Sequence, residues 1–376
     1  MNSKERHEAR FQRRVKEREK KKDLKLSQYD DFNLVANIDN LYEAFKSSMR
    51  GVSWKESIQR YEANAMRNII ESYRKLHDGE NMHRGFVEFI LNERGKIRHI
   101  RSVHISERVI QKCLCDKILT PIFTNSLIYD NGASIKGKGV HFAIRRFINH
   151  MTNFYRQNGN NNGYALSIDF TKYFDNIDHE ILFEMIDEKI KNIQIRKLIK
   201  SFITVFGDGK SLGLGSQVSQ IFAVFYPNKL DHFIKEKLKI KYYGRYMDDL
   251  YLIHKDKKYL IYCLNEINKI CDILKIKINY KKTCIHKLSQ PITFLKGRYS
   301  LLPSGCVLRR PTRDSAIRMR RKLVKFKTFI EEGKMSYHDL RTSYQSWRGN
   351  YKRRFNAYHR VKFMDRLYYN LFINPH

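Results

Sequence analysis

Apolar residues recur at helical spacing along residues 33–76, which predicts two or three amphipathic helices. Residues 84–103 alternate between apolar and polar positions around an Arg-Gly turn, which predicts a β-hairpin whose second strand is basic. A helix is expected over residues 107–119, ending before Pro121, because proline cannot continue a helix from its interior. These elements predict a helical N-terminal part that carries one hairpin.

A Gly-rich basic loop at residues 130–139 leads into a basic helix, and residues 157–163 (QNGNNNG) form a second loop. The pattern then becomes strand, helices, strand hairpin and helix, and the last stretch is helical, basic and rich in aromatic residues. We therefore expect four segments: a basic tail (1–27), N-terminal helices with the hairpin (28–160), a central sheet (161–300) and a helical basic segment (301–376).

The first acidic element is the apolar run Tyr164–Phe170. Strand alternation places Ala165, Ser167 and Asp169 on one face, and the two small residues leave that face open. A charge at the end of an apolar strand is costly unless something pairs with it. A metal ion is a natural partner for Asp169, although a carboxylate at a strand end is often only a cap or turn residue.

The second acidic element lies about eighty residues later, where two β-rich runs flank the turn of Tyr242–His254. Asp248 and Asp249 are adjacent in this predicted hairpin, so their charges repel unless cations hold them. Together with Asp169 they would form a site of three carboxylates, which suits Mg²⁺, with Mn²⁺ as an alternative. Two such ions roughly 3.5–4 Å apart can activate a 3′-hydroxyl and stabilise leaving pyrophosphate. A simple acidic turn is the alternative interpretation.

The net charge of the chain indicates what kind of molecule binds to it. The chain has 73 Lys and Arg against 39 Asp and Glu, a formal net charge of +34, which disfavours an ordinary metabolic enzyme and predicts binding to nucleic acid. The tail, residues 1–26, holds 11 basic and 5 acidic residues and is either a solvated helix or a nucleic-acid-binding arm. No apolar run is long enough to cross a membrane, no secretory signal is present, and six cysteines without metal-site spacing predict reduced thiols in the cytoplasm.

Two motifs carry a resemblance to a known family. The segment 169–175 (DFTKYFD) and the segment 246–249 (YMDD) resemble the catalytic motifs of reverse transcriptases, in the bacterial lineage of group II intron, retron and diversity-generating retroelement enzymes. The resemblance spans roughly residues 85–300. It implies an α+β right-hand polymerase with fingers, a palm of antiparallel sheet and helices, and a helical thumb. Asp169 and Asp248 would be the principal ligands of two Mg²⁺ ions, supported by Asp249.

Further positions acquire roles from this resemblance. Phe170 would contact the nucleotide, and Phe174, four residues later, would exclude the ribose 2′-hydroxyl. Core packing is the alternative role for Phe174. The segment 215–220 (GSQVSQ) would place Gln220 against the nascent base pair. Lys282 would stabilise or protonate the pyrophosphate, with a solvated surface charge as its alternative.

The basic hairpin strand resembles the finger strands that grip the triphosphate through Lys96 and Arg98, and Arg98 can bind phosphate with two hydrogen bonds. The loop 134–139 resembles a template-contacting loop with Lys136 and Lys138, or else it is a solvated turn. Residues 294–297 (FLKG) resemble a primer-grip hairpin. The thumb would bind nucleic acid through Arg318, Arg321, Arg348, Lys352 and Arg353. Its aromatic residues either stack on bases or pack the helices.

The biological role has three alternatives. The Ser-Gln of residues 215–220 and the run 137–143 resemble enzymes of diversity-generating retroelements, which copy a structured RNA into cDNA from dNTPs and work with a small accessory protein. Antiphage defence reverse transcriptases share similar motifs and make templated or untemplated DNA. A host-encoded non-coding RNA is the alternative to the small accessory protein as a partner. A non-catalytic RNA-binding or assembly factor is the alternative from another class. None of these partners is a membrane.

Overall fold

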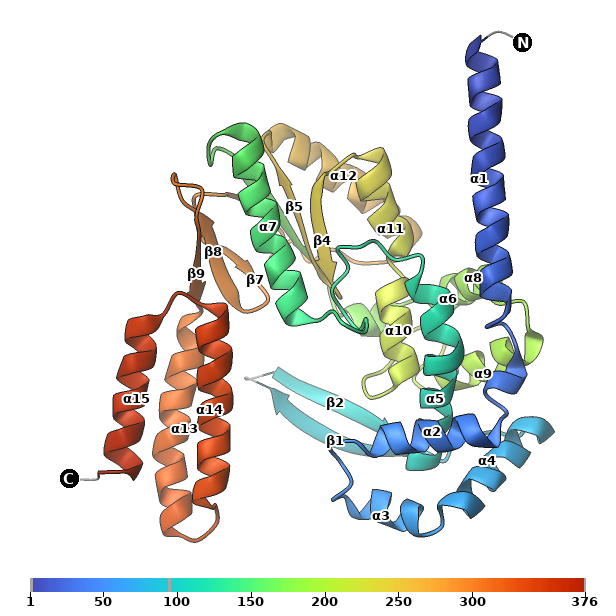
Figure 1. The fold of residues 1–376 in the computed structure, drawn as a ribbon, viewed down its shortest axis with the longest axis horizontal. Coiled ribbons are helices and arrows are strands. Elements are labelled where there is room, and N and C mark those ends of the chain that lie inside the picture. The colour runs from blue at the N-terminus through green and yellow to red at the C-terminus, as the bar shows by residue number, and fades with distance from the viewer. Residues whose placement is uncertain (1–2, 94–95, 375–376) are drawn as a thin grey trace. The chain divides into compact units, whose positions relative to one another are not determined.

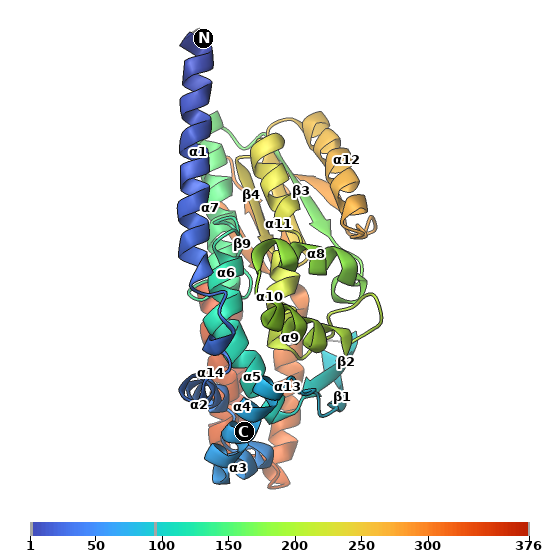
Figure 2. The ribbon, with the colours of Figure 1, turned by 90° about the vertical axis from the view of Figure 1, so that its right-hand side faces the viewer.

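The structure is a computed structural model that describes residues 3–93 and 96–374 of the chain. The fold divides into two compact units that interleave along the sequence (Figures 1 and 2). Unit 1 comprises Met1–Tyr129, Phe170–Phe233 and Ile267–Lys277. Unit 2 comprises Asp130–Asp169, Ile234–Glu266 and Ile278–His376.

Unit 1 begins with the long polar helix α1 (Ser3–Ser27), which extends away from the other helices of this unit in both ribbon views. Helices α2 (Ile38–Met49), α3 (Glu56–Ala63) and α4 (Ala65–Asp78) follow, which confirms the predicted amphipathic helices. Strands β1 (Phe86–Glu93) and β2 (Lys96–Val103) pair antiparallel, which confirms the predicted hairpin. Its turn, residues 94–95, lies outside the described residues.

The helix expected to end before Pro121 continues, and that prediction was wrong. Helix α5 (Ile105–Leu114) passes into a π-helical turn (Cys115–Leu119) and then into α6 (Thr120–Thr124). Pro121 lies in the first turn of α6, directly after the π-helical turn, where the regular i→i−4 hydrogen-bond ladder is already interrupted, so its missing N–H costs little. The remaining helices of unit 1 are α8 (His179–Lys189), α9 (Ile193–Thr204), α10 (Gln217–Phe225) and α11 (Asn228–His232).

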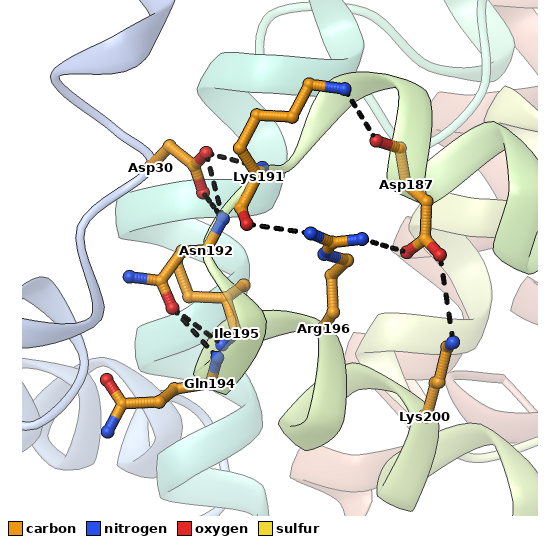
Figure 3. A network of polar contacts seen from close by, with 8 residues as sticks. All are labelled: Asp30, Asp187, Lys191, Asn192, Gln194, Ile195, Arg196 and Lys200. Atoms are coloured by element: carbon orange, nitrogen blue, oxygen red, sulfur yellow. Dashed lines mark hydrogen bonds and ion pairs between the residues drawn. The ribbon is translucent and has the colours of Figure 1, made fainter.

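A polar network joins the segment after α1 to the connection between α8 and α9 (Figure 3). The carboxylate of Asp30 accepts hydrogen bonds from the backbone N–H groups of Lys191, at 2.6 Å, and Asn192, at 3.2 Å. The side chain of Asn192 caps the first turn of α9, and Arg196 forms an ion pair with Asp187 at 3.5 Å. These contacts fix the base of α1 to the helices of unit 1, although α1 itself is exposed.

Unit 2 is built on a four-stranded antiparallel sheet in the order β4-β5-β3-β6. The strands are β3 (Tyr164–Asp169), β4 (Tyr242–Tyr246), β5 (Asp249–His254) and β6 (Cys284–Lys287). Helix α7 (Val140–Asn158) runs beside β4 and β5, and its Phe147 and Phe154 share a core with Tyr251 of β5 (Figure 1). Helix α12 (Lys257–Ile273) starts in this unit and ends in unit 1.

A second sheet in unit 2 contains β7 (Ile292–Phe294), β8 (Gly297–Leu301) and β9 (Val307–Pro311). Strands β7 and β8 form the hairpin expected around residues 294–297. Strand β9 was not expected, because the sequence predicted that residues 301–376 are helical. The segment VLRRP is short and lacks clear alternation, and it becomes a strand by pairing with β8.

Three helices complete unit 2: α13 (Arg313–Glu331), α14 (Tyr337–Arg354) and α15 (Tyr358–Phe372). Their core includes Leu323, Leu340 and Tyr344, and Tyr351 is also buried, so these tyrosines pack helices. Helices and antiparallel sheets together give the predicted α+β class. Within the described residues, every helix is too short or too polar to cross a membrane.

Candidate active site

Two of the predicted carboxylates face each other across the central sheet. Strands β3 and β5 pair antiparallel with Asp169, the last residue of β3, directly opposite Asp249, the first residue of β5. Directly opposed positions in an antiparallel pair lie close together, so two like charges there repel unless cations are near. The register therefore brings together two acidic residues that are eighty positions apart in the sequence.

The third carboxylate lies in the turn between β4 and β5. Tyr246 pairs with Asp249, which leaves Met247 and Asp248 as the two residues of the turn and confirms the predicted hairpin. Met247 has a φ of 55°, a left-handed conformation that a non-glycine residue rarely adopts. Arg245, only 1% exposed, donates from Nη1 to the carbonyl of Met247 at 3.1 Å. A buried guanidinium thus holds the turn that presents Asp248.

A lysine and an asparagine converge on Asp169 from the segment before β6. Lys282 Nζ lies 2.6 Å from Asp169 Oδ2, and Asn279 Nδ2 donates to the same oxygen at 3.1 Å. The backbone N–H of Asn279 also donates to the carbonyl of Asp169 at 2.8 Å. The Asp169 side chain is 15% exposed, whereas that of Lys282 is 54% exposed. The Lys282 ammonium is therefore accessible to an anionic substrate.

All three carboxylates act on the pKa of this lysine. The hydrogen bond to Asp169 raises the pKa of Lys282, and the charges of Asp169, Asp248 and Asp249 raise it further. Lys282 therefore stays protonated at neutral pH. The resemblance-based roles of these four residues stay predictions, but the structure does bring the four together in unit 2.

The donor set fits a hard divalent cation. Carboxylate oxygens suit Mg²⁺, which takes one or two protein carboxylates and completes its shell with waters and substrate phosphates. Within the described residues, no group of three or more His, Cys, Asp or Glu side chains forms a ready metal-binding cluster. The contacts of Asp169 with Lys282 and Asn279 occupy Oδ2, so an ion would bind through Oδ1 or replace these donors.

A buried polar network supports the β4–β5 hairpin from the side of α7. The Tyr251 hydroxyl lies 3.0 Å from His150 Nδ1, and the His150 ring lies 3.5 Å from the Asp130 carboxylate. Arg146 donates to Asp130 at 2.5 Å, and Lys235 lies 3.5 Å away. Burial opposes ionisation of Asp130, but its hydrogen bonds with His150 and Arg146 outweigh this and lower its pKa. The network anchors β5 two residues after Asp249.

Residues 130–132 also pair with β4 beside the acidic turn. The backbone carbonyl of Asp130 accepts a hydrogen bond from the backbone N–H of Arg245 at 3.2 Å, and the backbone N–H of Gly132 donates to the carbonyl of Arg245 at 3.0 Å. Sequence reasoning missed Arg245, Asp130, His150 and Asn279 as supports of the site. The only local signal was a basic residue immediately before the YMDD string, because burial and long-range pairing are not visible in the sequence.

The predicted nucleotide-contacting residues other than Lys282 belong to unit 1. Phe170 is 2% exposed and packs beside Tyr173, whereas Phe174 is half-buried and Gln220 is exposed on α10. Arg98 is half-buried on β2, opposite Leu91. The side chain of Lys96 lies outside the described residues. The nucleotide-binding roles of these residues stay predictions.

Strand β2 and the loop before α10 are connected in a way that the sequence did not indicate. Arg101 donates from its backbone N–H to Leu214 at 3.2 Å and from Nη1 to the carbonyl of Phe206 at 3.1 Å. Gly215, with a φ of 126°, lies against the carbonyl of Arg101, where an added Cβ would approach to 2.4 Å. Gly215 is therefore required for this close approach of two backbones.

The side chains predicted to bind nucleic acid in unit 2 differ in their exposure and in the contacts they already make within the protein. Lys136 is exposed, but Lys138 donates to the carbonyl of Asn131 at 3.2 Å. Arg348 forms two hydrogen bonds with Asp365, at 2.6 and 2.9 Å, so its charge is already paired inside the helical bundle. Arg318 is half-buried, and the remaining predicted contacts are exposed: Arg321, Lys352 and Arg353.

Comparison with known proteins identifies the family. A family profile described as reverse transcriptase (RNA-dependent DNA polymerase) matches residues 90–296, more than half of the chain. The chain belongs to this family. No curated protein matches the sequence.

Solved structures of telomerases are similar to part of this chain. A telomerase from Candida albicans, in complex with a fragment of telomeric RNA, aligns with a TM-score of 0.46 and 11% identity, over 66% of this chain and 49% of that one. An apo telomerase from Candida tropicalis, truncated from its C-terminal domain, aligns with a TM-score of 0.46 and 15% identity, over 59% and 54%. The chain thus spans about half the length of these telomerase chains.

Proposed function

We propose that the protein is an RNA-directed DNA polymerase that makes cDNA from dNTPs on a structured RNA template. The observation that carries this proposal is the pairing of Asp169 with Asp249 across β3 and β5, with Asp248 in the adjoining turn and Lys282 among the three charges. Membership of the reverse transcriptase family supports it. The net charge of +34 provides the attraction for a polyanionic template and product.

In this proposal Asp169 and Asp248 hold two Mg²⁺ ions and Asp249 supports them. Bound Mg²⁺ would supply activation of the primer 3′-hydroxyl and neutralisation of the leaving pyrophosphate. Lys282 is protonated and half-exposed, so its ammonium can move from Asp169 to the triphosphate oxygens when the site is loaded. There it stabilises the negative charge on the departing pyrophosphate and can donate a proton to it.

The finer assignments belong to the same proposal. Lys96 and Arg98 bind the triphosphate, Phe170 and Phe174 shape the sugar site, and Gln220 faces the nascent pair. Template and product are held by Lys136, Lys138, Arg318, Arg321, Lys352 and Arg353. Arg348 contributes through its ion pair with Asp365, which holds α14 against α15.

We place the enzyme in a bacterial diversity-generating retroelement in the cytoplasm, with a small accessory protein as partner. The Ser-Gln at positions 219–220 and the run 137–143 support this placement. An antiphage defence enzyme, working with a host-encoded non-coding RNA, is the alternative role for the same chemistry.

A primer-extension assay with an RNA template and Mg²⁺ tests the polymerase activity. Asp248→Asn should reduce extension by about a hundredfold or more, because it removes a charged ligand at the reacting centre. Asp256→Asn is the matched control, since Asp256 is an exposed acid just after β5 that caps the N–H of Lys258 at 2.7 Å. Extension should survive this control. A wild-type protein that binds RNA and extends no primer would favour the RNA-binding factor.

A further inference from the structure

A buried carboxylate in unit 1 has no part in the proposed chemistry. Glu107 lies on α5 and is 0% exposed, and an ionised carboxylate in such a place is costly unless hydrogen-bond donors hold it. Burial raises the pKa of Glu107, whereas its contacts with His83 and Gln111 oppose that rise. The contacts of Glu107 therefore indicate what this buried group does.

Glu107 belongs to a chain of buried hydrogen bonds. Its Oε2 lies 3.0 Å from His83 Nδ1, and Gln111 Nε2 donates to its Oε1 at 2.9 Å. The other end of the same amide, Gln111 Oε1, accepts from the hydroxyl of Ser216 at 3.0 Å. Ser216 Oγ in turn accepts from the backbone N–H of Ser219 at 3.3 Å. We call His83, Glu107, Gln111 and Ser216 the Glu107 relay, in which Gln111 and Ser216 are each 1% exposed.

The chemistry of these groups gives the relay one direction. His83 engages Oε2 of Glu107, whichever of the two carries the proton, so Oε1 is left as an acceptor. The amide of Gln111 must then turn its NH₂ toward Glu107 and its carbonyl toward Ser216. The one hydroxyl proton of Ser216 goes to that carbonyl, which leaves the lone pairs of its Oγ for the N–H groups at the start of α10. Glu107 thus acts through two side chains on the cap of α10.

Contacts from the β1–β2 hairpin hold the start of the loop whose end the relay holds. The ring centroid of His83 lies 4.5 Å from that of Phe86, and the centroid of Phe86 lies 5.0 Å from that of Phe206. Arg101 of β2 also donates from Nη1 to the carbonyl of Phe206 at 3.1 Å. Because the relay reaches the last residue of this loop, residues 206–216, both ends of the loop are fixed.

The same loop contacts two positions that are proposed to contact the nucleotide. The backbone N–H of Leu212 donates to the carbonyl of Phe174 at 3.0 Å. The backbone N–H of Gln220, in the first turn of α10, donates to the carbonyl of Ser216 at 3.4 Å. A shift of Ser216 therefore moves Gln220 relative to Phe174.

We propose that Glu107 and Gln111 are positioning residues for the incoming nucleotide, because through Ser216 they fix the loop 206–216 and the place of Gln220 at the start of α10. The nucleotide part of this inference rests on the proposed function, whereas the relay itself does not. A loosened loop would bind dNTP less tightly, and the proposed metal ligands are not members of the relay. KM for dNTP should therefore rise in relay variants while kcat changes little.

Primer extension by the full chain, measured over a range of dNTP concentrations, tests this role. Gln111→Glu puts two carboxylates in contact, and KM for dNTP should rise about tenfold with kcat within about threefold of wild type. Adding Glu107→Gln to this variant restores one amide and one carboxylate, and the carboxylate at position 111 still accepts from Ser216. In this swapped pair KM should return to within about threefold of wild type.

A pair of serines supplies the matched control. Ser216→Ala removes the last hydroxyl of the relay and should raise KM as Gln111→Glu does, so it carries the test if Gln111→Glu does not fold. Ser72→Ala removes a hydroxyl that is also buried in unit 1 but that donates to the carbonyl of Asn68 on its own helix, α4, at 2.8 Å. KM in this control should stay within about twofold of wild type.

Hydrogen–deuterium exchange of residues 206–220 measures the effect of the relay without polymerisation. Exchange should be faster than in wild type in Gln111→Glu and Ser216→Ala, and equal to wild type in the swapped pair and in Ser72→Ala. Unchanged exchange, or faster exchange with an unchanged KM, would overturn the positioning role, and so would a loss confined to kcat. A wild type that extends no primer would contradict the proposed function instead, while the exchange result still tests the relay.

Discussion

The hydroxyl of Tyr251 offers a sharp test of the network behind the acidic hairpin. Tyr251 lies on β5 opposite Ser167, and its ring packs 4.6 Å from that of Phe147. Its hydroxyl shares a hydrogen bond with buried His150 at 3.0 Å. Tyr251→Phe keeps the ring and its packing and removes only this hydroxyl. The variant therefore isolates one polar contact.

The expected cost in unfolding free energy is about 1–3 kcal/mol, because a buried His150 nitrogen loses its partner where water cannot easily replace it. Tyr242→Phe is the matched control: its hydroxyl bonds to exposed Gln157 at 2.8 Å, so water can substitute and the cost should be about 0.5 kcal/mol or less. Urea unfolding followed by circular dichroism measures both. A Tyr251→Phe protein as stable as wild type, or no less stable than the control, would refute the network.

Three further predictions concern the same unit. Gly244→Ala should destabilise the protein by about 1–3 kcal/mol in urea unfolding, because its Cβ would lie 2.5–2.8 Å from the ring and hydroxyl of buried Tyr251. Lys282→Gln should slow primer extension by at least about tenfold while Lys281→Gln, an exposed neighbour, leaves it unchanged; equal effects would contradict the role of Lys282. The pKa of Asp130 is lowered in the folded state, so its stabilisation is present above the unfolded value of about 3.8 and is lost as pH falls below it. The stability gap between wild type and Asp130→Asn should accordingly shrink below about pH 4 in acid titrations followed by circular dichroism.

The local parts of the site were predictable from the sequence. Two β-rich runs around Met247-Asp248 and an apolar strand ending in Asp169 indicated a hairpin and a strand, and both are present. The pairing of Asp169 with Asp249 was not derivable from periodicity, because register between distant strands depends on tertiary packing. The sequence analysis predicted a shared site of three carboxylates, but not that Asp169 and Asp249 lie directly opposite each other.

Other features depended on contacts that leave no local signal. The π-helical turn at Cys115–Leu119 admits Pro121 into the next helix, and β9 forms because β8 offers it a free edge. Arg348 was predicted to contact nucleic acid because its neighbours are basic, and the structure adds two hydrogen bonds with Asp365, seventeen residues later, that the sequence did not indicate. Partners elsewhere in the chain thus decide that β9 forms and that Arg348 is paired with Asp365.

Sequencing the nucleic acid that co-purifies with the protein from its native host tests the central claim most directly. Wild type should carry one structured RNA and complementary DNA, and the Asp248→Asn protein should carry the RNA without the DNA. The errors and ends of that DNA would then separate diversity generation from defence. If both proteins carry the same RNA and neither carries DNA, templated DNA synthesis at Asp169, Asp248 and Asp249 is contradicted, and an RNA-binding role takes its place.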